Sequence, residues 1–514
     1  MSAWAFIIMN NKVQEKTMNT LLTKSTLSAA IALTLVACSG GGGSSGGVAG
    51  IGGSGYISSG SVTGFGSVFV NGVEFETDTA EFEIEGETSG RSQTDLVEGM
   101  RVKVFGTISD DGVTGTATKV EFEDQLEGPV SSATFTEDAD LENKTFTVLG
   151  VTVNINSVDT NFVGTTYDLI ASGDNIQISG FFDDTGVLQA TAVVEKDAFV
   201  AGTTIIEAKG TISALSSNDF TLTVGSATLT VNADGADTSQ VTGGLANGQF
   251  VEVKGTITAV DGTSISATLV KLEDNNPAEG AEVEIEGIIT DFSAATNTFK
   301  IDGIAIDASS TTLTKTPSTL TLVDGIKVEV EGPVSNGVLQ ANTLKLREGN
   351  VKVYAPASGV TENTADNTFT FTMTVSDDPV TVTVNKSTRL DDKVITETFA
   401  EAATKLGNQF LRVRGIPDGT NSIIATRARI EQPDDDVILQ GVVDSKDSGN
   451  NTITVLGITV EVNGTTEFTD IDNTPFIGGQ GNFFNGLVEG TTLVKIKDKD
   501  PVDGFADEVE LQLP

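Results

Sequence analysis

Val251-Glu252-Val253-Lys254-Gly255 decides the fold, because this alternating stretch with its closing glycine recurs along the whole chain. Alternation of apolar and polar residues predicts a β-strand with one apolar face. Successive closing glycines stand 74, 75, 77 and 83 residues apart. Self-similarity at a nearly constant period indicates an array of like units. The other copies are 102–106, 176–180, 328–332, 411–415 and 494–498, the last of which ends in Asp498 instead of glycine.

Each copy of the repeat predicts five short strands. In the first copy, a hairpin over Val68–Phe75 turns at Asn71-Gly72, a pair that favours the positive φ angles of a tight turn. After a variable connector comes the glycine-closed strand, followed by a second turn at Asp111-Gly112 and a last strand over Ala117–Phe122. The fifth copy lacks a clean glycine in its first hairpin, and its connector predicts a short helix at 396–406.

The strand order indicates the fold class. Three strands, a connector and two strands is the order of an OB-type barrel, and closing the sheet removes its exposed edges. We therefore expect an all-β chain, a tandem array of about six small five-stranded OB-like β-barrels of about 75 residues each. The alternatives are an open β-sandwich and a solenoid in which each unit completes the next. One face of each strand is expected in the core and the other in water.

The repeats and the N-terminal composition divide the chain into eight segments. The predicted segments are a signal peptide at 1–37, a Gly/Ser tether at 38–55, and repeats at 56–125, 126–200, 201–277, 278–349, 350–433 and 434–514.

The N-terminus has the pattern of a secretory signal. From Met18, which we take as the true start, a short basic region precedes an apolar run that ends in Leu35-Val36-Ala37-Cys38. The last four residues resemble the bacterial lipobox. The resemblance implies that Cys38 is lipidated and becomes the first mature residue, and that Ser39 directs the protein to the outer membrane. The alternative is an ordinary signal peptide with a chance cysteine.

Composition excludes several kinds of chemistry. The formal net charge of −42 opposes nucleic-acid binding, which depends on basic residues that neutralise phosphates. There is no histidine, and Cys38 is the only cysteine. Intrachain disulfides, thiolate zinc sites and Ser-His or Cys-His catalysis are therefore ruled out. No cofactor and no small-molecule substrate is indicated.

The repeats are similar to a bacterial family catalogued as domain of unknown function 5666. Its pattern of Leu-x-x-Gly followed by Val-x-Val-x-Gly is carried best by the first four copies, and the resemblance spans about residues 56–514. The family often occurs in tandem behind lipobox signals and has no assigned activity. The resemblance therefore supports the fold and the cellular address, and it names no site.

Three functional interpretations remain. The first is a lipid-anchored cell-envelope array that binds or scaffolds without catalysis, attached to the outer membrane and facing the periplasm or the surface, with an envelope protein or polysaccharide as ligand. The second is a calcium-binding, adhesin-like surface protein whose metal candidates are the turn residues Asp110, Asp111, Asp183 and Asp184. The geometry of a tight turn alone favours aspartate and glycine, so these residues are also explained without a metal ion. The third, ranked lowest, is a carboxylate-based glycan-processing enzyme.

Overall fold

The computed structural model describes most of the chain from Tyr56 onward. The described residues are 56–110, 112–131, 135–137, 142–273, 277–318, 320–363, 368–385, 388–390, 399–431, 436–471, 474–499 and 503–512. The predicted signal peptide, tether and Cys38 lie outside them. Within the described part, no helix is both long and apolar enough to cross a membrane.

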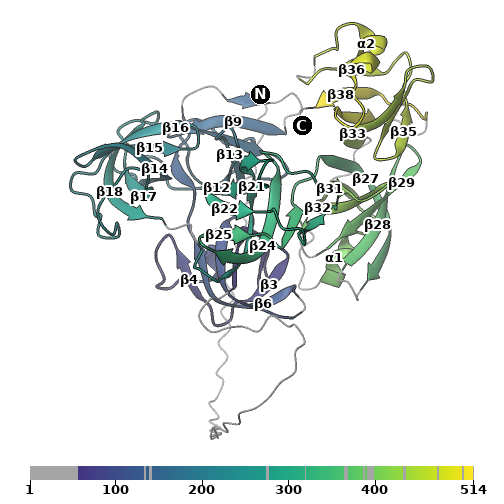
Figure 1. Cartoon of the computed structure of the whole chain (residues 1–514). Helices are drawn as coiled ribbons and strands as arrows, with labels where there is room; N and C mark the ends of the chain where they lie inside the picture. Colours follow the sequence, from purple (N-terminus) through teal and green to yellow (C-terminus); the bar gives the residue numbers. More distant parts are fainter. Residues whose placement is uncertain are drawn as a thin grey trace, which may run out of the picture. The chain divides into compact units, whose positions relative to one another are not determined.

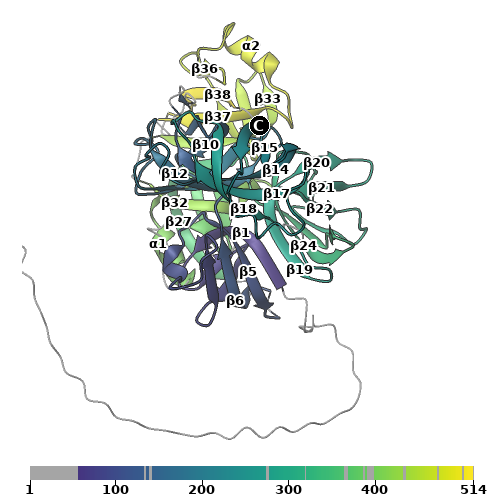
Figure 2. The same ribbon diagram turned by 90° about the vertical axis from the view of Figure 1, so that its left-hand side faces the viewer.

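The first repeat is a closed five-stranded barrel. Strand β1 pairs with β2 on one side and with β5 on the other, β2 pairs with β3, and β6 joins β3 to β5. The β3–β6 pair is parallel and the other pairs are antiparallel. Figure 2 shows β1, β5 and β6 side by side. The elements are β1 (Tyr56–Gly64), β2 (Val68–Val70), β3 (Val73–Glu76), β4 (Glu81–Ile84), the 3-10 turn Gln93–Asp95, β5 (Arg101–Ile108) and β6 (Thr114–Phe122).

The second and third repeats follow the same ring order. The second closes through the Val130–Val148 bridge and the third through β14 and β15. The strands of the second are β7 (Leu126–Pro129), β8 (Thr136–Glu137), β9 (Asn143–Val148), β10 (Val151–Asn156), β11 (Asn161–Val163), β12 (Asn175–Phe182) and β13 (Leu188–Glu195). Those of the third are β14 (Ile206–Ser216), β15 (Asp219–Val224), β16 (Ala227–Asn232), β17 (Phe250–Thr256) and β18 (Ser264–Leu272).

The fourth repeat closes through β20, which follows β19 directly in the chain and pairs with β21. Its strands are β19 (Glu282–Ile288), β20 (Thr290–Ser293), β21 (Thr298–Ile301), β22 (Ile304–Asp307), β23 (Thr314–Thr316), β24 (Lys327–Ser335), β25 (Val338–Gln340) and β26 (Thr343–Leu346).

The last two repeats each add one helix. In the fifth, β27 pairs with both β28 and β31, and Figure 1 shows these strands with helix α1. Its elements are β27 (Val351–Asn363), β28 (Thr368–Val375), β29 (Asp378–Val384), β30 (Arg389–Leu390), α1 (Phe399–Leu406), β31 (Phe410–Pro417) and β32 (Ser422–Ile430). The sixth has β33 (Val437–Asp447), β34 (Thr452–Val455), β35 (Ile458–Glu461), β36 (Glu467–Thr469), α2 (Gly479–Gly486), β37 (Leu493–Asp498) and β38 (Glu508–Gln512).

These pairings confirm the predicted fold class and settle the two alternatives. Each ring closes within its own repeat, the sixth through the Glu461–Phe505 bridge, so the repeats are neither open sandwiches nor turns of a solenoid. The helix expected in the fifth connector is α1. The fifth repeat also makes its first hairpin without glycine, because Ser376 and Asp377 adopt φ angles of 45° and 66°.

The glycine that closes each Val-x-Val-x-Gly strand has a steric cause. At Gly180 a side chain would place its Cβ less than 3.0 Å from the backbone oxygen of Gln189 on the neighbouring strand. The β12–β13 register shifts at this point, so the bulged partner backbone presses against the glycine. In the sixth repeat the β37–β38 pairing ends at Lys497, one residue before Asp498, and no glycine is needed there.

The barrels associate through their first strands. Strand β1 pairs with β19 of the fourth repeat, β7 pairs with β14 of the third, and β27 pairs with β33 of the sixth. The first strand of each barrel therefore has a partner on both sides, which leaves fewer free edges.

The expectation that the polar face of each strand faces water is wrong for the glycine-closed strands. Gln177, Glu252 and Glu329 alternate with the apolar residues, yet they are only 5, 2 and 1 % exposed. The polar side chains of these barrels pack against other parts of the chain, because the barrels lie against one another. Ion pairs between repeats include Arg101–Asp302, Lys209–Glu123, Lys254–Glu85, Lys352–Glu142 and Arg414–Asp159.

We predict that Gly180→Ala destabilises the protein by about 2 kcal/mol, because the added Cβ overlaps the bulged strand. Gly464→Ala is the matched control, since Gly464 has open space around it, and it should change stability by less than about 0.5 kcal/mol. Urea unfolding followed by circular dichroism measures both. Equal effects would contradict the steric explanation of the repeated glycine.

We also predict an acid-sensitive contact at Glu142. Burial raises the pKa of its carboxyl, but Lys352 at 2.5 Å and the charge of Arg412 outweigh burial and bring the pKa to about 2, below the ordinary 4.5. The contact therefore stabilises the fold fully above pH 4.5, and on the order of 2 to 3 kcal/mol is lost as the pH falls towards 2.

Unfolding of Glu142→Gln and wild type at pH 7 and pH 3 checks this expectation. The variant should be less stable at pH 7 and should differ less from wild type at pH 3. Glu362→Gln, at an exposed position, is the control. A constant difference between Glu142→Gln and wild type would contradict the proposed ion pair.

Candidate ligand cavity

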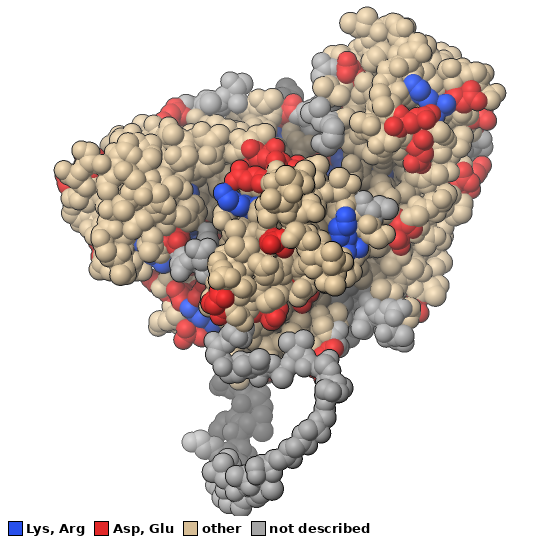
Figure 3. Space-filling view, in the orientation of Figure 1, with Lys and Arg blue, Asp and Glu red and all other residues tan. Residues whose placement is uncertain are grey.

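Basic side chains are unevenly distributed along this acidic chain. On the face drawn in Figure 3, acidic side chains are spread widely and basic ones are confined to a few places. The sequence contains eight arginines, and five of them belong to the fifth repeat. These five are Arg389, Arg412, Arg414, Arg427 and Arg429.

The barrel geometry places four of these arginines on one surface. Arg412 and Arg414 alternate with the core residues of β31, and β32 sets Arg429 opposite Arg412 and Arg427 opposite Arg414. Like charges directly opposite one another destabilise a sheet unless other groups compensate them. Glu431 of the same repeat compensates Arg412 and Arg429, at 3.4 and 3.2 Å, so the other pair, Arg414 and Arg427, needs negative charge from outside the barrel.

The second repeat supplies part of that negative charge. The Asp159 carboxylate, in the turn after β10, lies 2.5 Å from Arg414 Nη1 and 3.3 Å from Arg427 Nη1. Arg389 donates a hydrogen bond of 2.6 Å to the backbone oxygen of Asp159. Arg414 also pairs with Glu348 at 2.9 Å. One aspartate thus faces three guanidinium groups.

A cavity of about 230 Å³ lies between these residues and the first, second and fourth repeats. Five basic and three acidic side chains line it, which leaves an excess of two positive charges. The basic residues are Lys327, Arg347, Arg389, Arg414 and Arg427, and the acidic ones are Asp159, Glu286 and Glu348.

Amide and hydroxyl groups of the second repeat form another part of the wall. Asn154 donates to Gln189 at 2.8 Å, and Asn156 donates to Asn143 at 2.8 Å. Each amide retains capacity for further hydrogen bonds. The Phe181 ring adds an apolar surface over which Lys327 Nζ lies 4.4 Å from the centroid.

The charge state of the cavity follows from its ion pairs. Burial raises the pKa of the Asp159 carboxyl, but Arg414 and Arg427 hold it well below the usual range. Burial likewise opposes ionisation of Glu286, but Lys327 and Arg347 lower its pKa to about 2. Burial and the charge of Arg389 lower the pKa of Arg427 to about 9, so it remains protonated at neutral pH.

Two arginines of the cavity have hydrogen-bond donors that no group of the described protein accepts. The Nε atoms of Arg389 and Arg427 are buried and have no hydrogen-bond partner among the described residues. Buried donors are ordinarily satisfied by protein, water or ligand. The cavity can therefore accept a small anionic group, with the amides available for neutral oxygens beside it.

A larger cavity of about 620 Å³ has a different balance of basic and acidic side chains. Three basic and four acidic side chains line it, and several of them already pair with one another. The basic ones are Arg101, Lys103 and Lys209, and the acidic ones are Glu121, Glu123, Glu273 and Asp302. This cavity lacks the unmatched positive charge of the smaller one.

The residues that the sequence predicted as calcium ligands lie elsewhere. Asp110 is exposed in the turn after β5, Asp111 is outside the described residues, and Asp184 is exposed in the turn after β12. The carboxylate of Asp183 stabilises that turn, because it accepts hydrogen bonds from Thr185, Val187 and Gln189. Groups of three clustered carboxylates found in the described part of the chain do not include these residues.

Two such carboxylate groups could hold a metal ion. They are Glu85 with Asp124 and Glu207, and Glu123 with Glu252 and Glu273. In the second group, Lys271 forms ion pairs with all three glutamates.

Sequence reasoning missed both the cavity and the carboxylate groups, because each is assembled from several repeats. One signal was present in the sequence. The fifth repeat carries arginine at the alternate positions of 411–415, and the fourth repeat carries glutamate at the equivalent positions of 328–332. A reversal of charge between equivalent strands indicates that those surfaces face opposite partners.

No curated protein matches the chain. Among solved structures it is similar to a chain described as drosophila Unr CSD456, with 11% identity and a TM-score of 0.14 over 43% of this chain and 98% of that one. A similarity with so low a score supports no further argument.

The family comparison covers more than half of the sequence. The family described as Domain of unknown function (DUF5666) matches residues 54–121, 127–194, 209–271, 272–345 and 440–491. The fifth repeat, which carries the arginines, lies between the last two matches. With five matched segments and a closed barrel in each repeat, the chain belongs to the DUF5666 family.

Proposed function

We propose that this chain is a lipid-anchored cell-envelope protein that works without catalysis as a binding array, and that its arginine-lined cavity holds a carboxylate of an acidic polysaccharide. The single observation that carries the proposal is the excess of two positive charges in that cavity, within a chain of net charge −42.

Guanidinium groups are suited to this ligand. Their planar donors bind carboxylates through two parallel hydrogen bonds, and such charge-assisted bonds are stronger than neutral ones. The amides of Asn154, Asn156 and Gln189 suit the hydroxyl groups that flank a sugar carboxylate. The volume of about 230 Å³ accommodates a group of monosaccharide size.

Two of the three acidic residues of the cavity, Asp159 and Glu286, favour binding over hydrolysis. A glycoside hydrolase needs one carboxylic acid whose pKa is raised so that it can protonate the leaving group. The pKa values of Asp159 and Glu286 are instead lowered by the basic residues around them. Both carboxylates therefore act as counterions that hold the arginines in place.

The cellular address in the proposal rests on the sequence. The Leu35–Cys38 lipobox and the glycine-rich segment after it fit a lipid anchor with a tether at the outer membrane. Acidic polysaccharides are accessible ligands there.

We predict that purified protein binds oligogalacturonate in calorimetry, and that Arg389→Gln or Arg427→Gln weakens binding tenfold or more, because each variant removes a charge-assisted donor. Arg91→Gln is the matched control. Its arginine pairs with Glu87 and Asp95 in the first repeat and does not line the cavity.

Two further ligands identify the source of the anion. Neutral dextran should not bind, and polyphosphate should bind more weakly than oligogalacturonate. Tighter binding of polyphosphate would replace the carboxylate with a phosphate ligand. Equal affinity of wild type and both cavity variants would contradict the site.

For the anchor, we predict that Cys38→Ser moves the protein from the membrane fraction to the soluble fraction and abolishes labelling by radioactive palmitate. The substitution removes the sulfur that would be acylated. Persistent membrane association and labelling of the variant would contradict the lipidation site.

A further inference from the structure

A second charge imbalance, of negative sign, surrounds a buried aspartate. Asp124, in the segment between β6 and β7, is 0 % exposed, and neither of its carboxylate oxygens has a hydrogen-bond partner among the described residues. A buried, unpaired carboxylate is costly, because desolvation penalises the charge and nothing compensates it.

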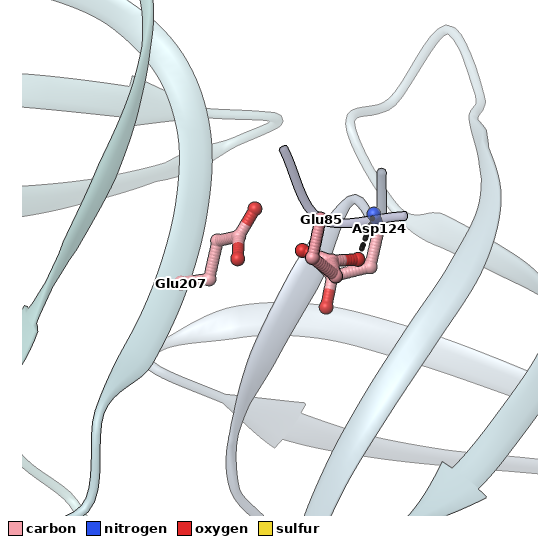
Figure 4. Close-up of side chains that lie close together, drawn as sticks. All are labelled: Glu85, Asp124 and Glu207. Atoms are coloured by element: carbon pink, nitrogen blue, oxygen red, sulfur yellow. Dashed lines mark hydrogen bonds between the residues drawn. The ribbon is translucent and has the colours of Figure 1, made fainter. Parts of the chain in front are cut away.

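Two more carboxylates face Asp124. Glu85 follows β4, and its Oε1 accepts a 3.1 Å hydrogen bond from the backbone nitrogen of Asp124. Glu207 on β14 is 3 % exposed, and its Oε1 also has no hydrogen-bond partner in the described structure. Figure 4 shows the three side chains converging from separate elements.

The neighbouring basic groups do not balance these charges. Lys254 lies 2.7 Å from Glu207, 3.2 Å from Glu85 and 3.0 Å from Glu252. Lys209 and Lys271 serve the adjoining group of Glu123, Glu252 and Glu273. Six acidic groups thus share three lysines, so carboxyl groups outnumber ammonium groups by three in a largely buried region.

The spacing fits one metal ion. One oxygen from each of Glu85, Asp124 and Glu207 can be chosen so that all three lie within 4.8 Å of one another. Two oxygens that each bind calcium at about 2.4 Å can be that far apart. Calcium takes six to eight oxygen ligands, so two free Asp124 oxygens, the glutamates and water can complete the shell.

We propose that Glu85, Asp124 and Glu207 bind one calcium ion that joins the first repeat to the third. Glu85 belongs to the first barrel, Asp124 to the segment that leaves it, and Glu207 to the first strand of the third barrel. The ion adds two positive charges to a region in which carboxyl groups outnumber lysines by three. The proposal is independent of the polysaccharide cavity and of the turn aspartates.

Burial and the charge of Glu85 raise the pKa of the Asp124 carboxyl well above its usual range. A proton is therefore the competing occupant of the same position. Calcium binding and protonation make different predictions for substitutions around the site.

Calorimetric titration of the chelator-stripped mature protein with calcium chloride tests the proposal. We expect one site that Asp124→Asn removes, and a rise of a few degrees in the melting temperature of wild type on addition of millimolar calcium. Glu273→Gln, from the neighbouring lysine-paired group, is the control and should retain the site.

Two further measurements keep the test decisive if a variant folds poorly. Lys254→Met removes the ammonium that competes for Glu85 and Glu207, and we expect it to tighten calcium binding at least threefold. In calcium-free buffer, Asp124→Asn should melt at a higher temperature than wild type, because it removes a buried carboxyl that must take up a proton when the protein folds.

The proposal is overturned if wild type takes up no calcium at 1 mM, or if Asp124→Asn binds it with unchanged stoichiometry and affinity. Unchanged affinity in Lys254→Met would overturn it as well. Loss of polysaccharide binding would leave this result unaffected.

Discussion

The structure depends on one constraint: charged side chains on the outer faces of the barrels are buried, so each needs an opposite charge from its own barrel or from a neighbouring one. A small barrel has too little interior to stabilise itself strongly. Packing barrels together buries more surface, but it also buries residues such as Glu329 and Arg414. Buried charges are tolerated when they are paired and hydrogen-bonded. The pairs between repeats therefore decide which barrels can lie together.

Both proposed sites follow from places where this matching is incomplete. The fifth repeat presents arginines to Asp159 and Glu348, and a positive excess remains around the cavity. At the junction of the first and third repeats the acidic groups outnumber the lysines, and the carboxylate of Asp124 has no hydrogen-bond partner among the described residues. An uncompensated buried charge is a position where binding of an opposite charge is favourable. The same packing thus creates an anion site and a cation site in one acidic chain.

Local sequence patterns predicted the barrels well, because each barrel is built from residues close in sequence. The Asn71-Gly72 turn, the ring order of the strands and the α1 helix all follow from short-range rules. The steric role of Gly180 required the bulge in its partner strand to be seen. The sites were beyond sequence reasoning, since Asp159 and Arg427 are 268 residues apart and nothing local relates them. The clustering of the turn aspartates suggested calcium ligands, but the carboxylate of Asp183 accepts a hydrogen bond from Val187 within its own turn.

A crystal structure of the mature protein with a galacturonate trisaccharide tests the central claim most directly. We expect a sugar carboxylate to occupy the cavity, within hydrogen-bond distance of Arg389 or Arg427, with amides of the second repeat contacting the adjacent hydroxyls. A complex with the sugar bound elsewhere, while the cavity arginines contact only acidic side chains of the chain itself, would contradict it.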